Sequence, residues 1–272
     1  MTTSSLAVRG SAALFVLLAT AATASAQQVI ISTNTNESID GTAIDRNDAV
    51  LYDAATGTVS TVYRGLGGDL DAFYLNADGS FLGSGNFNAT LGSTTYTDEQ
   101  VYRVDVSGDS LFFDFGTIGG TDVSGFDIAE DGAYIFSDRS GGTIGGITVA
   151  DGDIVRYDPT SMTTSILVAQ SALFDDGVGE ISAIDLLPDG RLVLSASSDE
   201  AVSGTVYADG SLFIYDPTTD TASLLLDESI FDDGDSDIDA VFVVSLIAVP
   251  EPTSVASFGA AGLLLLARRR RA

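Results

Sequence analysis

The residues of this chain that are best placed to do chemistry are aspartates that alternate along one short stretch. Asp233, Asp235, Asp237 and Asp239 stand two residues apart, and Gly234 interrupts the run. Carboxylate oxygens are the hard ligands that Ca²⁺ prefers, and the ion accepts roughly six to eight of them. The spacing therefore predicts a calcium site. The alternative interpretation is a solvated acidic loop that leads into a strand.

Three further acids are the first residues of copies of one repeated motif, and they extend the predicted site. The copies DLDAFYLNADGSFLGS, DVSGFDIAEDGAYIFS and EISAIDLLPDGRLVLS begin at Asp69, Asp122 and Glu180, and a truncated copy, DIDAVFV, begins at Asp237. Equivalent positions in a repeat can meet around one axis. A ring of carboxylates there is unfavourable unless it is hydrated or bridged by a cation. We therefore expect these acids to contribute to the calcium site.

Composition removes most kinds of catalytic centre. The chain has no His and no Cys, and all of its 11 basic residues are Arg. These absences exclude a Ser-His-Asp triad, a Schiff-base lysine and a thiol nucleophile. A pair of carboxylates could still hydrolyse a glycoside. Because the chain has 39 acids, a pair is always available, and the sequence identifies no catalytic residue.

The charge of the chain also limits its partners. The net charge is −28, and residues 27–248 alone hold 38 acids against 6 Arg, a charge of −32. Nucleic acids and anionic lipid headgroups need Lys or Arg to neutralise their phosphates. A strongly acidic surface instead favours divalent cations and cationic partners. We expect no nucleic-acid partner.

The elements that must position these acids follow a repeat of more than fifty residues. One marker is the Asp of a Tyr-Asp-like motif, and a second marker is a Ser in a short apolar strand. The first set is Asp53, Asp105, Asp158 and Asp216, and the second is Ser32, Ser84, Ser137 and Ser195. Both sets advance by 52, 53 and 58 residues. Two markers in step make chance similarity improbable.

Each repeat predicts four short antiparallel strands joined by Asp-Gly and Asp-Pro turns. Four-stranded units repeated along a chain are typical of a β-propeller. The segments resemble the propeller repeats of the NHL-like and strictosidine-synthase-like families in their DG…Y.D..T pattern. VIIST, near residue 27, lacks a first strand, and DIDAVFV lacks a second. We therefore predict an all-β propeller of four four-stranded blades closed by the two termini, with a β-sandwich or β-solenoid as the alternative.

The loops predict where a ligand would bind. The long connections after the second strands and those after the fourth strands would open on one face of the propeller. That face also receives the acids that precede the first strands. We expect the ligand site of residues 27–248 on this face.

Two terminal segments predict export. Residues 1–26 contain one charge, an apolar run and a small-x-small pattern that ends at Ala26, which is typical of a signal peptide cut by signal peptidase. Residues 249–272 contain a Pro-Glu-Pro sequence, an apolar segment at 255–267 and a cluster of arginines. The residues that carry this pattern are Pro250, Glu251, Pro252, Arg268, Arg269, Arg270 and Arg271.

This C-terminal order resembles the PEP-CTERM sorting signal of Gram-negative bacteria. The resemblance implies recognition and cleavage by an exosortase-like enzyme during export, in cells that often make exopolysaccharide. A permanent membrane anchor is the alternative, with the arginines on the cytoplasmic side. Either route predicts a protein of the cell surface, outer envelope or extracellular matrix.

The sequence therefore predicts an exported, non-enzymatic binding or structural module that is stabilised by Ca²⁺, with exopolysaccharide or surface proteins as candidate partners. The alternative is a carboxylate-dependent hydrolase that acts on polysaccharide or ester substrates.

The calcium interpretation predicts a metal-dependent melting temperature. Millimolar CaCl₂ should raise the melting temperature of residues 27–248, and EDTA should reverse the rise, because bound metal stabilises the folded state by mass action. Asp235→Asn and Asp237→Asn should each reduce the rise. Identical melts in CaCl₂ and EDTA would leave the acidic run as a solvated loop.

Overall fold

Four antiparallel four-stranded sheets form the framework of the residues that the structure describes. A computed structural model of the 272-residue chain describes residues 27–66, 68–232, 234 and 236–246. The predicted signal peptide with Ala26, the sorting tail from Pro250 to Arg271, and Asp233 and Asp235 lie outside these residues. Within the described part of the chain, no helix has the length and apolar character needed to cross a membrane.

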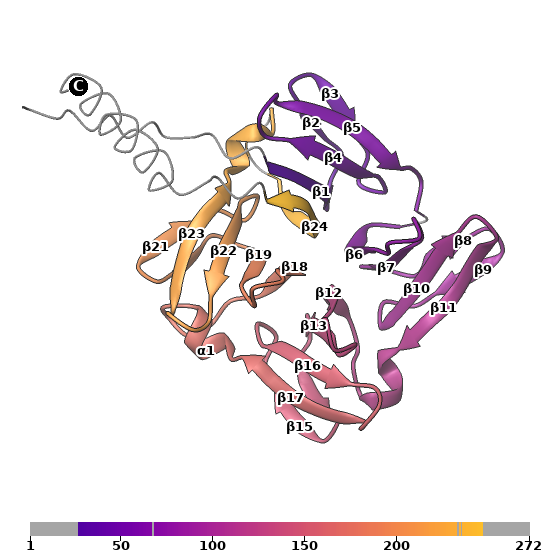
Figure 1. The fold of residues 1–272 in the computed structure, drawn as a ribbon, viewed down its shortest axis with the longest axis vertical. Helices are drawn as coiled ribbons and strands as arrows, with labels where there is room; N and C mark the ends of the chain where they lie inside the picture. Colours follow the sequence, from indigo (N-terminus) through magenta and orange to yellow (C-terminus); the bar gives the residue numbers. More distant parts are fainter. Residues whose placement is uncertain (1–26, 67, 233, 235, 247–272) are drawn as a thin grey trace, which may run out of the picture. The chain divides into compact units, whose positions relative to one another are not determined.

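The sheets lie around a common axis as four blades (Figure 1). Blade I contains β24 (Ile238–Leu246), β1 (Gln27–Thr33), β4 (Ala49–Asp53) and β5 (Thr58–Tyr63), in that order. Blade II contains β6 (Leu70–Leu75), β7 (Phe81–Gly85), β10 (Gln100–Asp105) and β11 (Gly108–Asp114). Blade III contains β12 (Val123–Ile128), β13 (Tyr134–Asp138), β16 (Ile154–Asp158) and β17 (Thr163–Val168). Blade IV contains β18 (Ile181–Leu186), β19 (Leu192–Ala196), β22 (Leu212–Asp216) and β23 (Thr221–Leu226).

The predicted fold class is confirmed: the described chain is an all-β propeller of four four-stranded blades. Blade I combines segments from both ends of the described residues, because β24 pairs antiparallel with β1 from Gln27↔Leu246 to Thr33↔Ile238. The four inner strands, β6, β12, β18 and β24, surround the axis (Figure 1).

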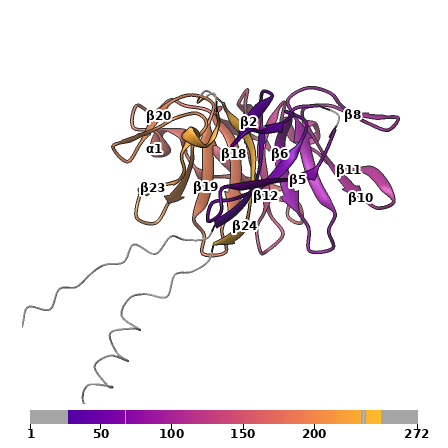
Figure 2. The same cartoon turned by 90° about the horizontal axis from the view of Figure 1, so that it is seen from above.

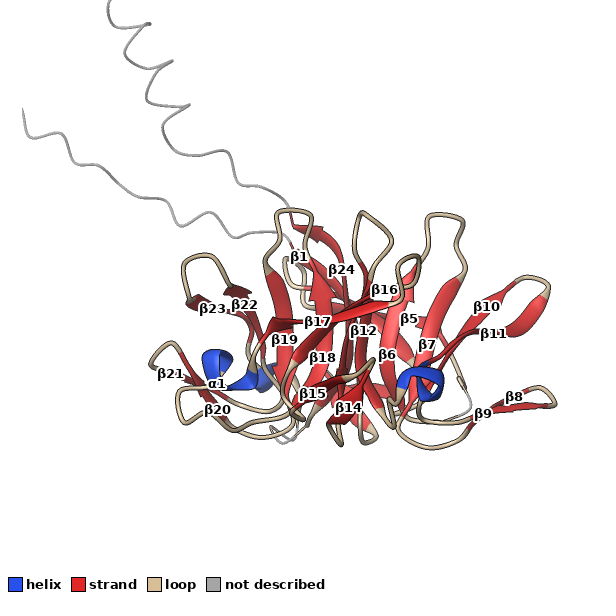
Figure 3. Cartoon of the chain, turned by 90° about the horizontal axis from the view of Figure 1, so that it is seen from below, coloured by secondary structure: helices blue, strands red, loops and turns tan. Residues whose placement is uncertain are grey.

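Each blade also has an extra hairpin that the sequence prediction treated as loop. The hairpins are β2 (Glu37–Ile39) with β3 (Thr42–Ile44), β8 (Ala89–Leu91) with β9 (Thr94–Tyr96), β14 (Gly142–Ile144) with β15 (Ile147–Val149), and β20 (Glu200–Val202) with β21 (Thr205–Tyr207). Short helical turns follow three outer strands: η1 (Phe115–Ile118), α1 (Gln170–Leu173) and η2 (Glu228–Ile230). The hairpins lie on one face, which we call the hairpin face (Figures 2 and 3).

The opposite face is formed by tight turns, and we call it the turn face. Each turn between the first and second strands of blades II, III and IV has an Asp followed by a Gly with a positive φ, as in Gly132 (φ 85°). The side chain of Asp131 accepts a hydrogen bond from the Ala133 amide at 3.2 Å. Glycine adopts a positive φ at little cost, and Asp closes such turns with its side chain. The turn motifs of the repeat thus have a structural role.

The marker aspartates close the turns between the third and fourth strands of each blade. Asp53, Asp105, Asp158 and Asp216 each accept a hydrogen bond from the amide two residues later, at 2.7–2.9 Å. A side-chain hydrogen bond, from Gln28, Ser107 and Ser161 in turn, is the first reason that the pKa values of Asp53, Asp105 and Asp158 are lowered, and the backbone bonds add to the effect. For Asp216 the backbone bond from Thr218 is the first reason that its pKa is lowered. The Tyr-Asp pattern is therefore a signature of the turn and does not mark a site.

The marker serines attach the long connections to the blades. The Ser137 hydroxyl lies 3.2 Å from the carbonyl oxygens of both Asp151 and Asp153. Ser84 and Ser195 make the same pair of contacts in blades II and IV. All three side chains are buried. A hydroxyl thus satisfies backbone carbonyls that close packing removes from water.

Apolar clusters fill each boundary between neighbouring blades. Between blades II and III, for example, Leu82 and Phe115 pack in one cluster with Phe136 and Val155. Equivalent clusters join blades III and IV, IV and I, and I and II. Each blade therefore buries both of its faces.

Small side chains let the inner strands approach each other at the axis. The third residue of each inner strand is Ala72, Gly125, Ala183 or Ala240, and all but the glycine are fully buried alanines. A Cβ added at Gly125 would lie 2.8 Å from Ile184 Cγ1. Such a distance forces a shift of one strand. Four strands around one axis leave no room for larger residues here.

The serine contacts predict a clear cost for removing one hydroxyl. Ser137→Ala should lower the free energy of unfolding by about 1–3 kcal/mol, because the carbonyls of Asp151 and Asp153 would lose the hydroxyl donor that they share. Chemical denaturation measures the change. The control is Ser165→Ala on the exposed side of β17, which should change stability by about 0.5 kcal/mol or less. Equal effects of the two substitutions would contradict the role of Ser137.

Candidate functional site

The acids predicted as a ring do gather at the hairpin-face end of the axis. Asp69, Asp122, Glu180 and Asp237 directly precede the four inner strands. Asp237 accepts a short hydrogen bond from the Asn34 side chain, and Asp69 lies 3.0 Å from Arg46 Nε. Among the residues that the structure describes, no three acids are arranged to hold a metal ion. Because Asp233 and Asp235 lie outside those residues, the calcium site stays a prediction.

A basic residue that the sequence did not single out lies within this ring. Arg139 follows β13, and its backbone amide donates to the Asp122 carbonyl at 2.9 Å. Its Nε lies 2.7 Å from Glu180 Oε1, and its Nη1 lies 3.9 Å from Asp71 Oδ2. The guanidinium thus bridges acids from two other blades. The chain supplies its own cation at this end of the axis.

One layer deeper, each inner strand has a β-bulge. The ladder with the second strand skips Asp71 in blade II, Ser124 in blade III, Ser182 in blade IV and Asp239 in blade I. A bulge changes the direction of one side chain. The two serines use it to donate across blades: Ser124 Oγ to the Ile181 carbonyl at 2.8 Å, and Ser182 Oγ to the Ile238 carbonyl at 2.9 Å.

The two aspartates at the same bulge position have no such bond. Neither carboxyl oxygen of Asp71, nor Oδ2 of Asp239, has a hydrogen-bond partner within the described residues. Burial raises the pKa of Asp239 to about 7, with nearby acids adding to the rise and Arg139 opposing it. Burial, followed by the charge of Asp239, raises the pKa of Asp71 well above its usual value. Both groups therefore bind protons more tightly in the folded chain than in the unfolded chain.

A second site lies at the turn-face end of the axis. The fifth residues of the inner strands are Tyr74, Asp127, Asp185 and Phe242, and together they line a cavity of about 350 Å³ that we call the axial pocket. Leu186, Leu187, Pro188, Val243, Val244 and Ile128 complete its lining. Two carboxyl groups and two aromatic rings thus face one cavity.

Backbone hydrogen bonds hold both carboxyl groups in place. Asp127 accepts from its neighbour Ile128 at 2.5 Å and, across the blade boundary, from the amide of Leu186. Asp185 accepts in the same way from the amide of Val243. Burial raises the pKa of Asp127 to about 7 despite these bonds. Burial and the charge of Asp127 raise the pKa of Asp185 well above its usual value.

The aromatic pair is held edge to face. The Tyr74 and Phe242 ring centroids lie 5.8 Å apart, with 88° between the ring planes. Burial, with the charges of Asp127 and Asp185, raises the pKa of Tyr74. The phenol is therefore neutral at physiological pH.

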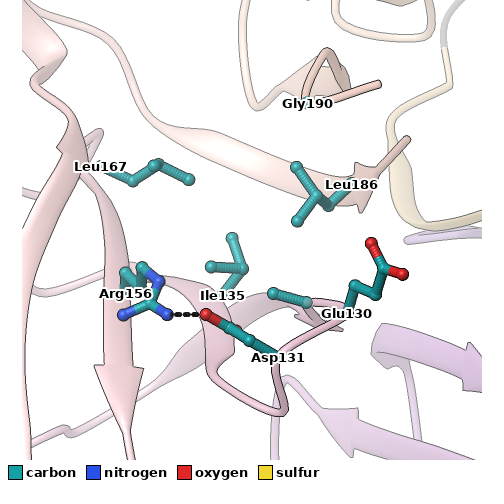
Figure 4. Close-up of a pocket in the computed structure, with 8 residues that line it drawn as sticks. Glu130, Asp131, Ile135, Arg156, Leu167, Leu186 and Gly190 are labelled. Atoms are coloured by element: carbon teal, nitrogen blue, oxygen red, sulfur yellow. Dashed lines mark hydrogen bonds and ion pairs between the residues drawn. The ribbon is translucent and has the colours of Figure 1, made fainter. Parts of the chain in front are cut away.

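The axial pocket continues into a groove between blades III and IV, which we call the inter-blade groove. A cavity of about 450 Å³ shares Ile128, Leu186, Leu187 and Pro188 with the axial pocket. It also shares Ala129, Glu130, Leu186 and Gly190 with an outer cavity of about 470 Å³. Figure 4 shows Ile135, Leu167 and Leu186 around this outer part, with Arg156 paired to Asp131 at one side.

The position of this groove differs from the predicted ligand face. The sequence prediction placed the ligand site on the hairpin face, whereas the axial pocket and the inter-blade groove open on the turn face. The sequence did contain a signal for them. Asp127 and Asp185 occupy the same position of the repeat, the fifth residue of an inner strand.

Comparison with known proteins gives no family. No family model matches the chain, and no curated protein matches it. Among solved structures, an auxiliary nutrient binding protein from Bacteroides thetaiotaomicron is 14% identical, with a TM-score of 0.35 over 74% of this chain and 49% of that protein. The β-propeller domain of Cps50 (Swd1) from Myceliophteria thermophila is 13% identical, with a TM-score of 0.32 over 73% and 56%.

Virginiamycin B lyase from Staphylococcus aureus is 10% identical, with a TM-score of 0.31 over 72% of this chain and 55% of that enzyme. The chain thus spans about half the length of these structures.

The buried carboxyl of Asp239 predicts how stability depends on pH. A pKa of about 7 in the folded state lies above the unfolded value, near 3.8. The stability that this group contributes is therefore complete below about pH 4 and is lost as the pH rises through about 7. Asp239→Ser, which copies Ser124 and Ser182, should unfold with a higher free energy than the wild type at pH 8, by roughly 1–4 kcal/mol. This gain in the free energy of unfolding should be smaller at pH 5.

Denaturant unfolding at the two pH values measures this difference. Asp199→Ser, in an exposed loop, is the control and should leave the pH dependence unchanged. A serine variant that is less stable than the wild type at pH 8 would show that the Asp239 carboxylate stabilises the axis, contrary to this prediction.

Proposed function

We propose that residues 27–246 form the non-enzymatic binding module of an exported protein, with the ligand site on the turn face. The observation that carries this proposal is the continuity of the axial pocket with the inter-blade groove. Ligand sites are typically concave and mostly apolar, with a few fixed polar groups. The groove has aliphatic walls at Ile135, Leu167 and Leu186, and its inner end has Asp127 and Asp185 held by backbone amides.

A hydrolase is the second candidate, and one observation favours it. Asp127 and Asp185 are neighbouring carboxyl groups with raised pKa values that line one cavity. Acid–base catalysis by two carboxyl groups uses such a pair. Turnover of a polysaccharide or ester that Asp185→Asn abolishes would establish this activity.

We also propose that the module is exported to the cell surface or extracellular matrix of a Gram-negative bacterium. The support is the order of the terminal segments, with Ala26 as the last residue of a signal peptide and the Pro250–Pro252 motif before an arginine cluster. Signal peptidase and an exosortase-like enzyme would process them. The intact mass of the protein recovered from the producing cells tests both cleavages. An intact mass that retained both segments would contradict the proposal.

The ligand site can be tested by blocking the inter-blade groove. Leu167→Arg places a long charged side chain in the groove, and Val62→Arg is the control. Both residues are 39% exposed and stand next to last in the outer strand of their blade. Ligands from a library of oligosaccharides, peptides and amines that raise the melting temperature should lose this effect in Leu167→Arg and keep it in Val62→Arg.

The rise in melting temperature that Leu167→Arg should lose is several degrees, since a ligand at about 100 times its Kd stabilises the folded state by about 2.7 kcal/mol. Ligands that stabilise the two variants equally would place the binding site elsewhere on the molecule.

A further inference from the structure

We propose that the axial pocket binds an alkylammonium group, held by the carboxylates of Asp127 and Asp185 and by the rings of Tyr74 and Phe242. The aliphatic arm of the ligand lies along the inter-blade groove. This inference rests on the proposed function, because it names the ligand class of the same site.

The two ends of the axis differ in how the charge of their acids is balanced. At each end, the inner strands of two neighbouring blades hold one buried acid each: Asp71 with Asp239, and Asp127 with Asp185. At the hairpin-face end Arg139 supplies a positive charge. At the turn-face end, none of the described residues that line the axial pocket is basic. Any cation that balances the charge of this pair therefore comes from outside the pocket lining.

The carboxylates of Asp127 and Asp185 have acceptor positions that no backbone hydrogen bond uses. Asp127 accepts two backbone hydrogen bonds, one at each oxygen, and Asp185 accepts a bond from Val243. An ionised carboxylate offers about four acceptor positions, so both groups can accept further donors. The backbone bonds fix the oxygens where they line the pocket. An ammonium N–H group entering the pocket meets positioned acceptors and need not reorganise them.

An aromatic pair completes the wall of the axial pocket. Tyr74 and Phe242 occupy the two remaining positions of the same layer and line the same cavity. Aromatic faces carry negative charge density and attract ammonium groups. The two rings stand edge to face, and both line the cavity. A cation is therefore favoured over a neutral or anionic head.

The groove determines the rest of the ligand. Leu186 lines both the axial pocket and the outer cavity, and Ile135 and Leu167 continue the apolar wall (Figure 4). Arg156, the one arginine among the described residues that line this groove, is already paired with Asp131. An aliphatic chain attached to the ammonium group gains apolar contact here.

Titration calorimetry of the purified exported protein with three six-carbon probes tests the inference. Hexylammonium should bind, whereas hexanol and hexanoate should bind at least tenfold more weakly. Asp127, Asp185 and Tyr74 are the titratable groups of the pocket lining, and burial raises the pKa of Asp127 to about 7. Hexylammonium affinity should therefore increase from pH 5 to pH 8, as more of the carboxyl groups ionise.

Two variants separate this inference from the proposed function. Asp185→Asn should weaken hexylammonium binding at least tenfold. Asp239→Asn, at a residue that is also buried but at the other end of the axis, should leave binding within twofold. If Asp185→Asn fails to fold, Tyr74→Leu serves in its place and should weaken binding at least threefold.

Three results would overturn the cation inference. They are equal binding of hexanol and hexylammonium, an affinity that does not change with pH, and full binding by Asp185→Asn or Tyr74→Leu. If Leu167→Arg still abolished binding in those cases, the groove would remain a ligand site without a cationic head group. If Leu167→Arg had no effect either, the proposed function would fail with the inference.

Discussion

The close approach of four inner strands around one axis is the constraint on which the rest of this structure depends. The strands fit together because Ala72, Gly125, Ala183 and Ala240 keep their third positions small. The same crowding excludes water from the side chains above and below this layer. Acids at those levels lose hydration, and their pKa values rise for that reason before any other. The geometry of the fold thus creates the electrostatics of both candidate sites.

The negative charge of these buried acids is balanced differently at the two ends of the axis. At the hairpin-face end, Arg139 reaches from blade III to acids of two other blades, and serines replace acids at two of the four bulges. At the turn-face end, the acids accept hydrogen bonds from backbone amides and line a cavity. An internally paired cluster supports the fold, whereas a cluster that opens into a cavity can also bind a ligand. This difference led us to place the ligand site on the turn face.

The sequence predicted the parts of this molecule that repeat. The marker aspartates and serines stay in step because each closes a turn or attaches a connection by the same local hydrogen bonds in every blade. The extra hairpins were missed because their strands are three residues long and lie in polar, glycine-rich connections. Arg139 was missed because it has no equivalent in the other repeats. Its role depends on the reach of a long side chain across the axis.

The axial pocket could have been found by reading across the repeats. The second positions of the four inner strands, from blade I to blade IV, are Asp, Asp, Ser and Ser, and the fifth positions are Phe, Tyr, Asp and Asp. Each described inner strand thus has one buried carboxyl group, two near one end of the axis and two near the other. Three residues of a strand separate the layers by about 10 Å. Two acids in each layer repel less than four in one layer, because the interaction falls with distance.

This alternation argues against a fourfold symmetric ligand. A metal ion on the axis would be coordinated best by one acid from every blade in the same layer, and neither buried layer has that arrangement. Each layer instead has its acids on one side and other groups on the opposite side. In the turn-face layer, carboxylates on blades III and IV oppose aromatic rings on blades I and II. A ligand that matches this layer has one cationic centre between the carboxylates and the aromatic rings. The rest of the ligand extends from the axis along the inter-blade groove, between blades III and IV.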